Sequence, residues 1–235
     1  ESGNLKISFK NKNNIFEYQI NENILDIISK DSNKLFKGLI EFKPFYLVSN
    51  FKYQTFRIKD VLNNPFFIEI LKSQALSNKN LNAMINFDVK NVYDFDRFSD
   101  LSLKLKIEEG NYNFSNSNII WKENVKVSFL DAFLNFDKEK INLNGRTSFD
   151  VKNQDEFFKF FQIKKDLRKN IGKIELDFNY DLNEEKITFD NLRIDNKSNK
   201  KIEEIISNFN SNNKKFFNKV TFKNFVNDIL AAYFG

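Results

Sequence analysis

Residues 141–151 read INLNGRTSFDV and residues 173–180 read KIELDFNY. In both stretches apolar side chains recur at every second position, with charged and amide side chains between them. A period of two places the apolar side chains on one face of an extended chain and the polar ones on the other. The stretch DLNEE at 181–185 predicts a tight turn into a further strand. The alternation then slips at 190–191, which predicts a β-bulge. The sequence therefore predicts a sheet with one apolar and one polar face.

Two residue types are missing from the chain, cysteine and histidine. Without thiols there are no disulfides, zinc–thiolate sites or thiol nucleophiles. Without imidazole, Ser-His-Asp and Cys-His systems and nearly all zinc sites are excluded. Any enzyme would have to work with carboxylates, lysines and hydroxyls. We therefore expect a protein that is not an enzyme and that holds no cofactor and no metal.

The charge of the chain is modest and dispersed, with a formal net charge of +5. Lysines are spread along the polar faces of the predicted strands. Phenylalanine, present 29 times, alternates with lysine onto opposite strand faces, so the two cannot grip one nucleic-acid strand together. We expect no nucleic-acid partner, while contact with anionic lipid headgroups is compatible with this charge.

Strand-like stretches with hairpin-length connections run through most of the chain, interrupted by helical inserts near 58–76 and 154–163. After 195 the apolar period changes from two to about 3.6. We predict a mainly β protein with minor α, a long curled antiparallel meander sheet that forms an open groove. The predicted domains are an antiparallel β-groove domain at 1–195 and a helical C-terminal tail at 196–235, packed on the sheet or capping it.

A sheet with one apolar face has to cover that face. Strands of eight to eleven residues are about 27–37 Å long, whereas a helix of about ten residues covers about 15 Å. The cover is therefore either the curled sheet itself or an apolar ligand. A curled trough of Phe, Leu and Ile fits acyl chains, and the alternative is a closed sandwich or barrel filled by its own side chains. The candidate lining residues are Leu81, Ile85, Phe87, Leu101, Leu103, Leu105, Ile107, Ile141, Leu143, Phe149, Ile174, Leu176, Phe178, Ile187 and Phe189.

Several short stretches carry a family resemblance. They are GLIEFKPF at 38–45, the strand ending in EEG at 108–110, INLNG at 141–145, the Phe-rich insert with FQI at 161–163, IGKIELDFNY at 171–180 with its hairpin, and LRID at 192–195. In this pattern of strands, glycines and apolar positions, most of the chain from residue 35 onward resembles the C-terminal region of AsmA-like proteins.

The resemblance implies a location and a function. AsmA-like proteins and the related TamB-type proteins are held in the inner membrane by an N-terminal helix. They extend into the periplasm as a repeating β-groove and are implicated in moving phospholipid to the outer membrane. The resemblance implies a non-enzymatic periplasmic segment that binds acyl chains, supports phospholipid transfer between the membranes and so serves outer membrane biogenesis. Its partners would be phospholipid or another acyl-chain lipid, together with envelope membrane proteins.

The membrane helix of the family would be absent from this segment. No apolar run in the chain approaches the roughly 18–20 residues that span a bilayer. We expect the segment to be tethered to the inner membrane through a helix outside it.

Two other functions stay open. One is a structural or assembly scaffold module of the cell envelope with a closed, self-filled core. The other is a carboxylate-dependent carbohydrate enzyme, which needs two carboxylates facing each other across a cleft. Asp94, Asp96 and Asp100 resemble the start of a calcium loop, but Ser99 and Leu105 stand where an EF-hand needs Gly and Glu. We expect no calcium site there.

Overall fold

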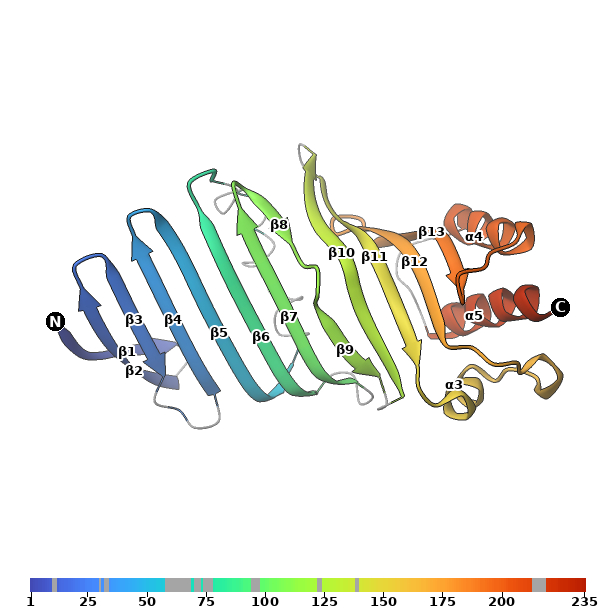
Figure 1. The fold of residues 1–235 in the computed structure, drawn as a ribbon, viewed down its shortest axis with the longest axis horizontal. Helices are drawn as coiled ribbons and strands as arrows, with labels where there is room; N and C mark the ends of the chain where they lie inside the picture. The colour runs from blue at the N-terminus through green and yellow to red at the C-terminus, as the bar shows by residue number, and fades with distance from the viewer. Residues whose placement is uncertain are drawn as a thin grey trace. The chain divides into compact units, whose positions relative to one another are not determined.

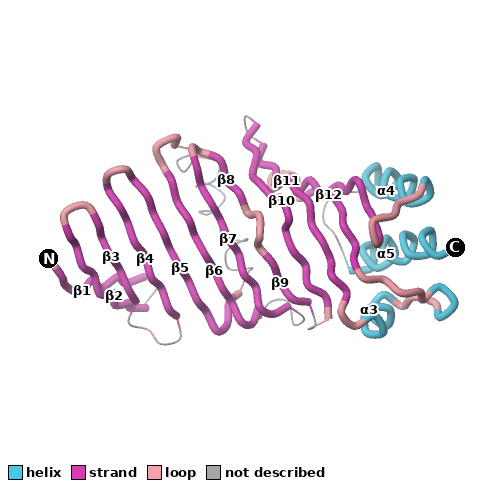
Figure 2. Tube along the Cα trace, viewed as in Figure 1, coloured by secondary structure: helices cyan, strands magenta, loops and turns pink. Residues whose placement is uncertain are grey.

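The structure is a computed structural model that describes residues 1–9, 12–29, 31, 34–57, 69, 73, 78–93, 98–121, 124–137, 140–212 and 219–235. Its contacts divide the chain into two compact units, Glu1–Ser117 and Asn118–Gly235. Strands dominate both units (Figure 2), so the predicted mainly β fold with a helical C-terminal tail is confirmed. The tail belongs to the second unit, together with five strands. The insert predicted near 58–76 lies outside the described residues, apart from Glu69 and Ser73.

The first unit is a sheet of strands that are neighbours in sequence and in space (Figure 1). Pairing is antiparallel from β1 to β5 and from β6 to β8. The strands are β1 (Ser2–Phe9), β2 (Lys12–Asn21), β3 (Ile24–Ser29), β4 (Lys34–Phe42), β5 (Phe45–Phe56), β6 (Asn82–Val92), β7 (Phe98–Glu108) and β8 (Asn111–Asn113).

One strand pair corrects the predicted antiparallel meander. β5 and β6 run parallel, with Phe51 opposite Phe87. A parallel pair needs a long connection, because the chain must return along the full length of the strand before it can pair again. The residues between Phe56 and Asn82 form that connection. In the first unit, the described strand pairs are therefore joined by hairpin-length connections, except for the crossover between β5 and β6.

The strands of the second unit pair antiparallel, each with the next along the chain. Its strands are β9 (Asn118–Trp121), β10 (Val125–Asp137), β11 (Lys140–Val151), β12 (Lys173–Asp181) and β13 (Lys186–Ile194). The stretch that dominated the sequence pattern forms β11, β12 and β13.

The bulge predicted at 190–191 is confirmed. The register between β12 and β13 shifts at this point, and Asn191 adopts a left-handed backbone with φ 49°. The extra residue changes the phase of the alternation. As a result Leu192 is buried, whereas Asp190 and Asn191 are exposed.

The Phe-rich insert forms the helix α3 (Gln154–Phe161), as predicted. Asn153 is its N-cap, and its side-chain oxygen accepts a hydrogen bond from the backbone N–H of Glu156 at 3.3 Å. The helix ends at Gln162, which adopts the left-handed conformation typical of a C-cap. Three of its phenylalanines are buried: Phe157, Phe158 and Phe161. A short 3-10 turn, η1 (Lys165–Leu167), follows.

The C-terminal tail forms α4 (Lys200–Asn212) and α5 (Lys219–Phe234), which lie beside β13 in Figure 1. Helix α4 contacts β13 and α5, and α5 also contacts α3. The rings of Phe189 on β13 and Phe225 on α5 are stacked with centroids 5.5 Å apart. Phe209 of α4 completes the cluster at 4.4 Å from Phe225. The core of the second unit therefore lies between the apolar face of its sheet and its own helices.

Candidate functional site

The apolar face of the first unit is the set of apolar positions that face one another across its paired strands. Residues directly opposite in a ladder point to the same side of a sheet. The register therefore places these residues on one face: Phe16, Tyr18 and Ile20 of β2; Leu25 and Ile27 of β3; Phe36 and Ile40 of β4; Leu47, Phe51 and Tyr53 of β5; Ala83, Ile85, Phe87 and Val89 of β6; and Leu101, Leu103, Leu105 and Ile107 of β7.

A row of phenylalanines crosses this face at right angles to the strands. Phe16 and Phe36 meet edge to face with ring centroids 5.8 Å apart. Phe36 lies 4.9 Å from Phe51, and Phe51 lies 6.1 Å from Phe87. Leu103 is opposite Phe87 on the next strand. Aromatic pairs at these separations stabilise each other beyond their burial, so the row is a continuous apolar band.

Most side chains of this face are only half-buried. Phe16, Phe36, Phe51 and Phe87 all keep part of their surface accessible, and so does Leu103. A well-covered core would bury such side chains almost completely. The face of the first unit is therefore apolar, continuous and incompletely covered.

One titratable group reports on the environment of this face. Burial, and to a lesser degree the negative charge of Asp31, raises the pKa of the Tyr53 phenol. Loss of water around a hydroxyl disfavours its charged form. The raised pKa therefore reflects the partial removal of this phenol from water.

The opposite face of the first unit is mixed: it carries polar pairs between strands together with exposed apolar side chains, which are Ile15, Ile24, Ile28, Leu35 and Met84. Asn86 donates a side-chain hydrogen bond to Asn50 at 2.9 Å, and Ser102 donates one to Asp88 at 2.8 Å. These pairs join neighbouring strands, β5 with β6 and β6 with β7. The predicted contrast between an apolar and a polar face therefore holds for β6 and β7 apart from Met84, and is weaker over β2, β3 and β4, where the opposite face also exposes apolar side chains.

The predicted lining residues of the first unit fall on this apolar face, apart from Leu81, which precedes β6. Ile107 is buried, with 2% of its surface exposed. The half-buried ones are Ile85, Phe87, Leu101, Leu103 and Leu105.

The predicted lining residues of the second unit also share one face, but that face is covered by helices. The buried ones are Ile141, Ile174, Leu176, Phe178 and Phe189. The half-buried ones are Leu143, Phe149 and Ile187. The expectation that the chain's own helices are too short to cover a sheet does not hold here, because α3, α4 and α5 together supply buried apolar side chains. At these lining positions the second unit therefore has a filled core and not an open trough.

Sequence reasoning missed the aromatic row of the first unit. Phe16, Phe36 and Phe51 lie on strands that the sequence does predict, yet none was among the candidates. The available signal was the same period of two, clearest at Leu47, Phe51 and Tyr53. What the period could not show is that these phenylalanines align across strands.

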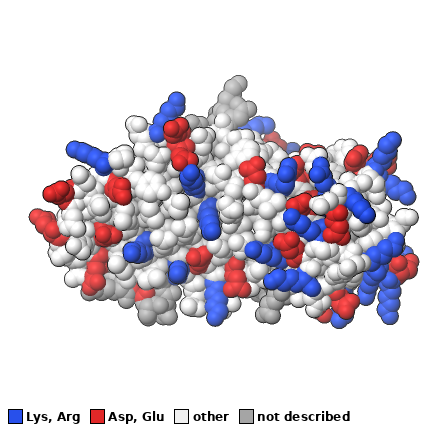
Figure 3. Space-filling view, in the orientation of Figure 1, with Lys and Arg blue, Asp and Glu red and all other residues white. Residues whose placement is uncertain are grey.

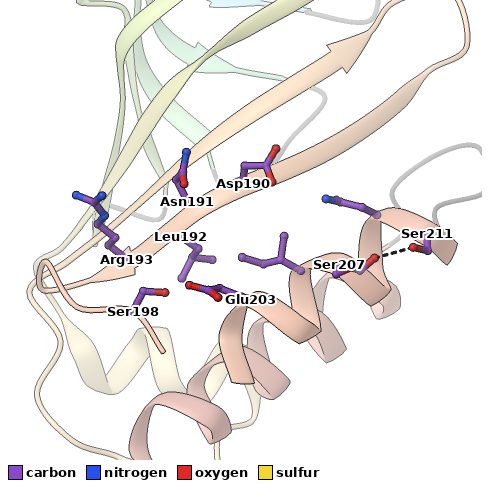
Figure 4. A pocket seen from close by; sticks show the side chains of 10 residues that line it. Asp190, Asn191, Leu192, Arg193, Ser198, Glu203, Ser207 and Ser211 are labelled. Carbon is purple, nitrogen blue, oxygen red and sulfur yellow. Dashed lines mark hydrogen bonds between the residues drawn. The ribbon is translucent and has the colours of Figure 1, made fainter. Parts of the chain in front are cut away.

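A polar hollow of about 560 Å³ lies between β13 and α4 (Figure 4). Figure 4 shows Asp190 and Asn191 pointing away from the helix. The Asn191 amide donates instead to Asp177 at 2.7 Å. The hollow is lined by Asp190, Asn191, Leu192, Arg193, Ser198, Glu203, Ile206, Ser207, Asn210 and Ser211.

Charged side chains of both signs are interspersed on the surface that Figure 3 presents. On the polar side of the second unit, Arg146 forms an ion pair with Asp177 at 2.9 Å. Partial burial alone would raise the pKa of the Asp177 carboxyl. Hydrogen bonds from Asn191 and Arg146, followed by the positive charge of Arg146 and Arg193, outweigh burial and lower this pKa below its ordinary value of 3.8.

This shift predicts a pH dependence of stability. A carboxyl with a lowered folded-state pKa stabilises the fold above its ordinary pKa, and that stabilisation is lost as the pH falls through the lowered value. We expect Asp177→Asn to lower the urea midpoint at pH 7 and to flatten its decline between about pH 5 and pH 2. Fluorescence of Trp121, the single tryptophan of the chain, would follow unfolding of the second unit. Asp228→Asn, which removes an exposed carboxylate of α5, serves as the control. If Asp177→Asn left the pH profile of stability unchanged, the lowered pKa of Asp177 would be contradicted.

Two kinds of chemistry find no support in the described residues. No group of three or more acidic side chains among them could hold a metal ion, while Asp94 and Asp96 lie outside the described residues. The paired strand positions that form the two apolar faces carry no Asp or Glu in the described ladders. The described positions of these two faces therefore do not offer the pair of facing carboxylates that a carbohydrate enzyme of this kind needs.

The fold and the site together define a class: a mainly β protein with an apolar strand face that is half-buried in the first unit and covered by helices in the second. Within the described ranges no helix has the length and apolarity to cross a bilayer. Neither a protein-family model, nor a curated protein, nor a solved structure matches the chain.

Proposed function

We propose that this protein is a non-enzymatic, AsmA-like β-groove segment that binds acyl chains of lipids on the apolar face of its first unit. In this role it supports phospholipid transfer between the inner and outer membrane from a periplasmic position. Phospholipid is the ligand, and envelope membrane proteins are further partners.

The observation that carries the proposal is the half-buried aromatic row of the first unit, from Phe16 through Phe36 and Phe51 to Phe87. Apolar surface in contact with water is unfavourable at about 25 cal/mol per Å². A large continuous apolar surface on a folded protein marks a binding site more often than not. An acyl chain has no polar groups to satisfy, so a face without carboxylates or other charges at its centre suits it.

A scaffold module with a closed core is the second candidate, and the second unit favours it. There the helices fill the apolar face, with Phe189, Phe209 and Phe225 in one cluster. If the first unit were closed in the same way by a protein partner, its apolar face would serve assembly and not lipid.

The two candidates differ in what the purified protein carries. We expect phospholipid to co-purify with the wild-type chain and to be detected by mass spectrometry of an organic extract. Phe51→Asp places a charge in the middle of the aromatic row, and burying a charge against acyl chains costs several kcal/mol. The variant should retain less than about one tenth of the lipid, since 1.4 kcal/mol is already tenfold in affinity.

Lys52→Asp is the matched control, because Lys52 is the next residue of β5 and is exposed on the opposite face. It should retain lipid like the wild type. Leu103→Asp on β7 repeats the test beside Phe87, at the end of the row. Circular dichroism checks that each variant is folded. Wild-type protein that is folded and free of lipid would overturn the lipid proposal in favour of the scaffold.

A further inference from the structure

The two units differ in how their apolar faces are covered. Phe51 and Phe87 of the first unit are half-buried, whereas Phe178 and Phe189 of the second are 9% and 6% exposed. The chemistry of the two faces is the same: Phe, Leu, Ile and Val at alternate strand positions. Among the described residues, the helices α4 and α5 pack on the second face, where Phe209 and Phe225 meet Phe189.

Helix α4 covers the edge of that face. Ile202 and Ile206 on its inner side are 0% and 5% exposed. Its Asn210 acts as a latch to the last strand: the side-chain oxygen accepts from the Phe189 N–H at 3.0 Å, and the amide donates to the Phe189 carbonyl at 2.8 Å. One amide thus satisfies both backbone groups of a residue on the outer edge of β13, in place of a neighbouring strand.

Beside this contact, α4 and β13 line a hollow. The hollow has a volume of about 560 Å³, and Leu192, Ile206 and Ser207 are among its lining residues. Figure 4 shows Leu192 on the strand side and Ser207 on the helix side. At the start of α4, the Asn199 amide donates to the Ala232 carbonyl of α5 at 3.1 Å. Helix α5 is also tied to other parts of the second unit. Asn227 donates to the Phe161 carbonyl at 2.8 Å, and Lys169 donates to the Phe234 carbonyl at 2.6 Å. Of the two tail helices, α4 is the one that lines this hollow.

We propose that α4 is a displaceable cover, which occupies the apolar face of the second unit until an acyl chain takes its place. The inference rests on the proposed lipid-binding function and adds a regulatory step to it. Displacement exchanges one apolar cover for another, because the acyl chain would bury Phe189 and Leu192 in place of Phe209 and Ile206 of α4. Release of the Asn210 latch is the polar step of this exchange.

The test measures a distance across the hollow in the full chain. The chain has no native cysteine, so Asp190→Cys on β13 and Ser207→Cys on α4 can be labelled with nitroxides without background. Both positions are exposed, so the labels leave the core intact. Double electron–electron resonance is then recorded without lipid and with vesicles of phosphatidylethanolamine and phosphatidylglycerol.

We expect one short distance without lipid and a second, longer distance whose fraction rises with vesicle concentration. Adding Asn210→Ala should increase the fraction of the longer distance several-fold at a given vesicle concentration. Asn208→Ala, an exposed amide on the same helix, is the matched control and should change nothing. Bridging the two cysteines with a bismaleimide should lower the number of phospholipids bound per chain.

The outcomes separate the cover from the proposed function. A single unchanged distance in protein that does bind phospholipid overturns the displaceable cover and leaves lipid binding by the first unit intact. An unchanged distance in protein that binds no phospholipid at all overturns both. An equal response of Asn210→Ala and Asn208→Ala overturns the latch.

Discussion

Gly145→Ala is expected to lower the free energy of unfolding of the second unit by about 3 kcal/mol, the upper end of the usual cost of overpacking, because the obstacles are backbone atoms. Gly145 lies on β11 opposite Ala132 of β10, just beyond the register shift between Phe129 and Asp131. A Cβ at Gly145 would overlap the backbone carbonyl oxygen of Asp131 and lie 2.7 Å from the Cα of Ala132. The strands must separate to admit it, because neither obstacle is a flexible side chain.

The measurement is urea unfolding followed by Trp121 fluorescence. Trp121 belongs to β9 and packs edge to face against Phe160 of α3 at 4.6 Å, so its emission reports on the second unit. Gly172→Ala is the control, because a Cβ there would meet only the Asp195 side chain, at 3.3 Å. Equal midpoints for Gly145→Ala and the wild type would show that the close approach of β10 and β11 is not a constraint.

Phe225→Ala is expected to destabilise the second unit by about 3–5 kcal/mol, the usual cost of deleting a buried phenylalanine ring. Phe225 is 6% exposed and touches the rings of Phe189 and Phe209. Its loss leaves a cavity where α4, α5 and β13 meet. Since the helices fill the apolar face of this unit, the cavity weakens the whole cover.

The same variant separates the roles of the two units. Phospholipid bound by the apolar face of the first unit should remain with Phe225→Ala under conditions in which the second unit is folded. Asn224→Ala, the exposed neighbour on α5, should match the wild type in stability. A loss of stability in Phe225→Ala no larger than in Asn224→Ala would mean that the aromatic cluster does not hold the helices on the sheet.

Much of the fold could be predicted from the local sequence. The alternation in 141–151 and 173–180 indicates β11 and β12 and assigns each side chain to a face. The slip at 190–191 indicates the bulge that brings Leu192 into the core. The change of period after residue 195 indicates the helical tail. Each of these follows from side-chain geometry within a few neighbouring residues.

The candidate site could be predicted only in part. Leu103 and Phe87 were identified because each strand shows which of its faces is apolar. The row from Phe16 to Phe87 was missed because it depends on the register between strands, which alternation within a strand does not fix. Phe178 and Phe189 have the same pattern as Phe87, and nothing local distinguishes a face that a helix will cover from one that stays accessible.

The sequence by itself therefore determined the strands, the two chemistries of their faces, the bulge and the helical tail. Only the tertiary structure decided that β5 and β6 run parallel, that Gly145 meets the backbone of β10, and that Asn210 holds the edge of β13. It also decided that one apolar face is half-buried and the other filled. The physical reason is range: a period reflects the geometry of adjacent residues, whereas coverage and strand order come from contacts between residues far apart in the chain.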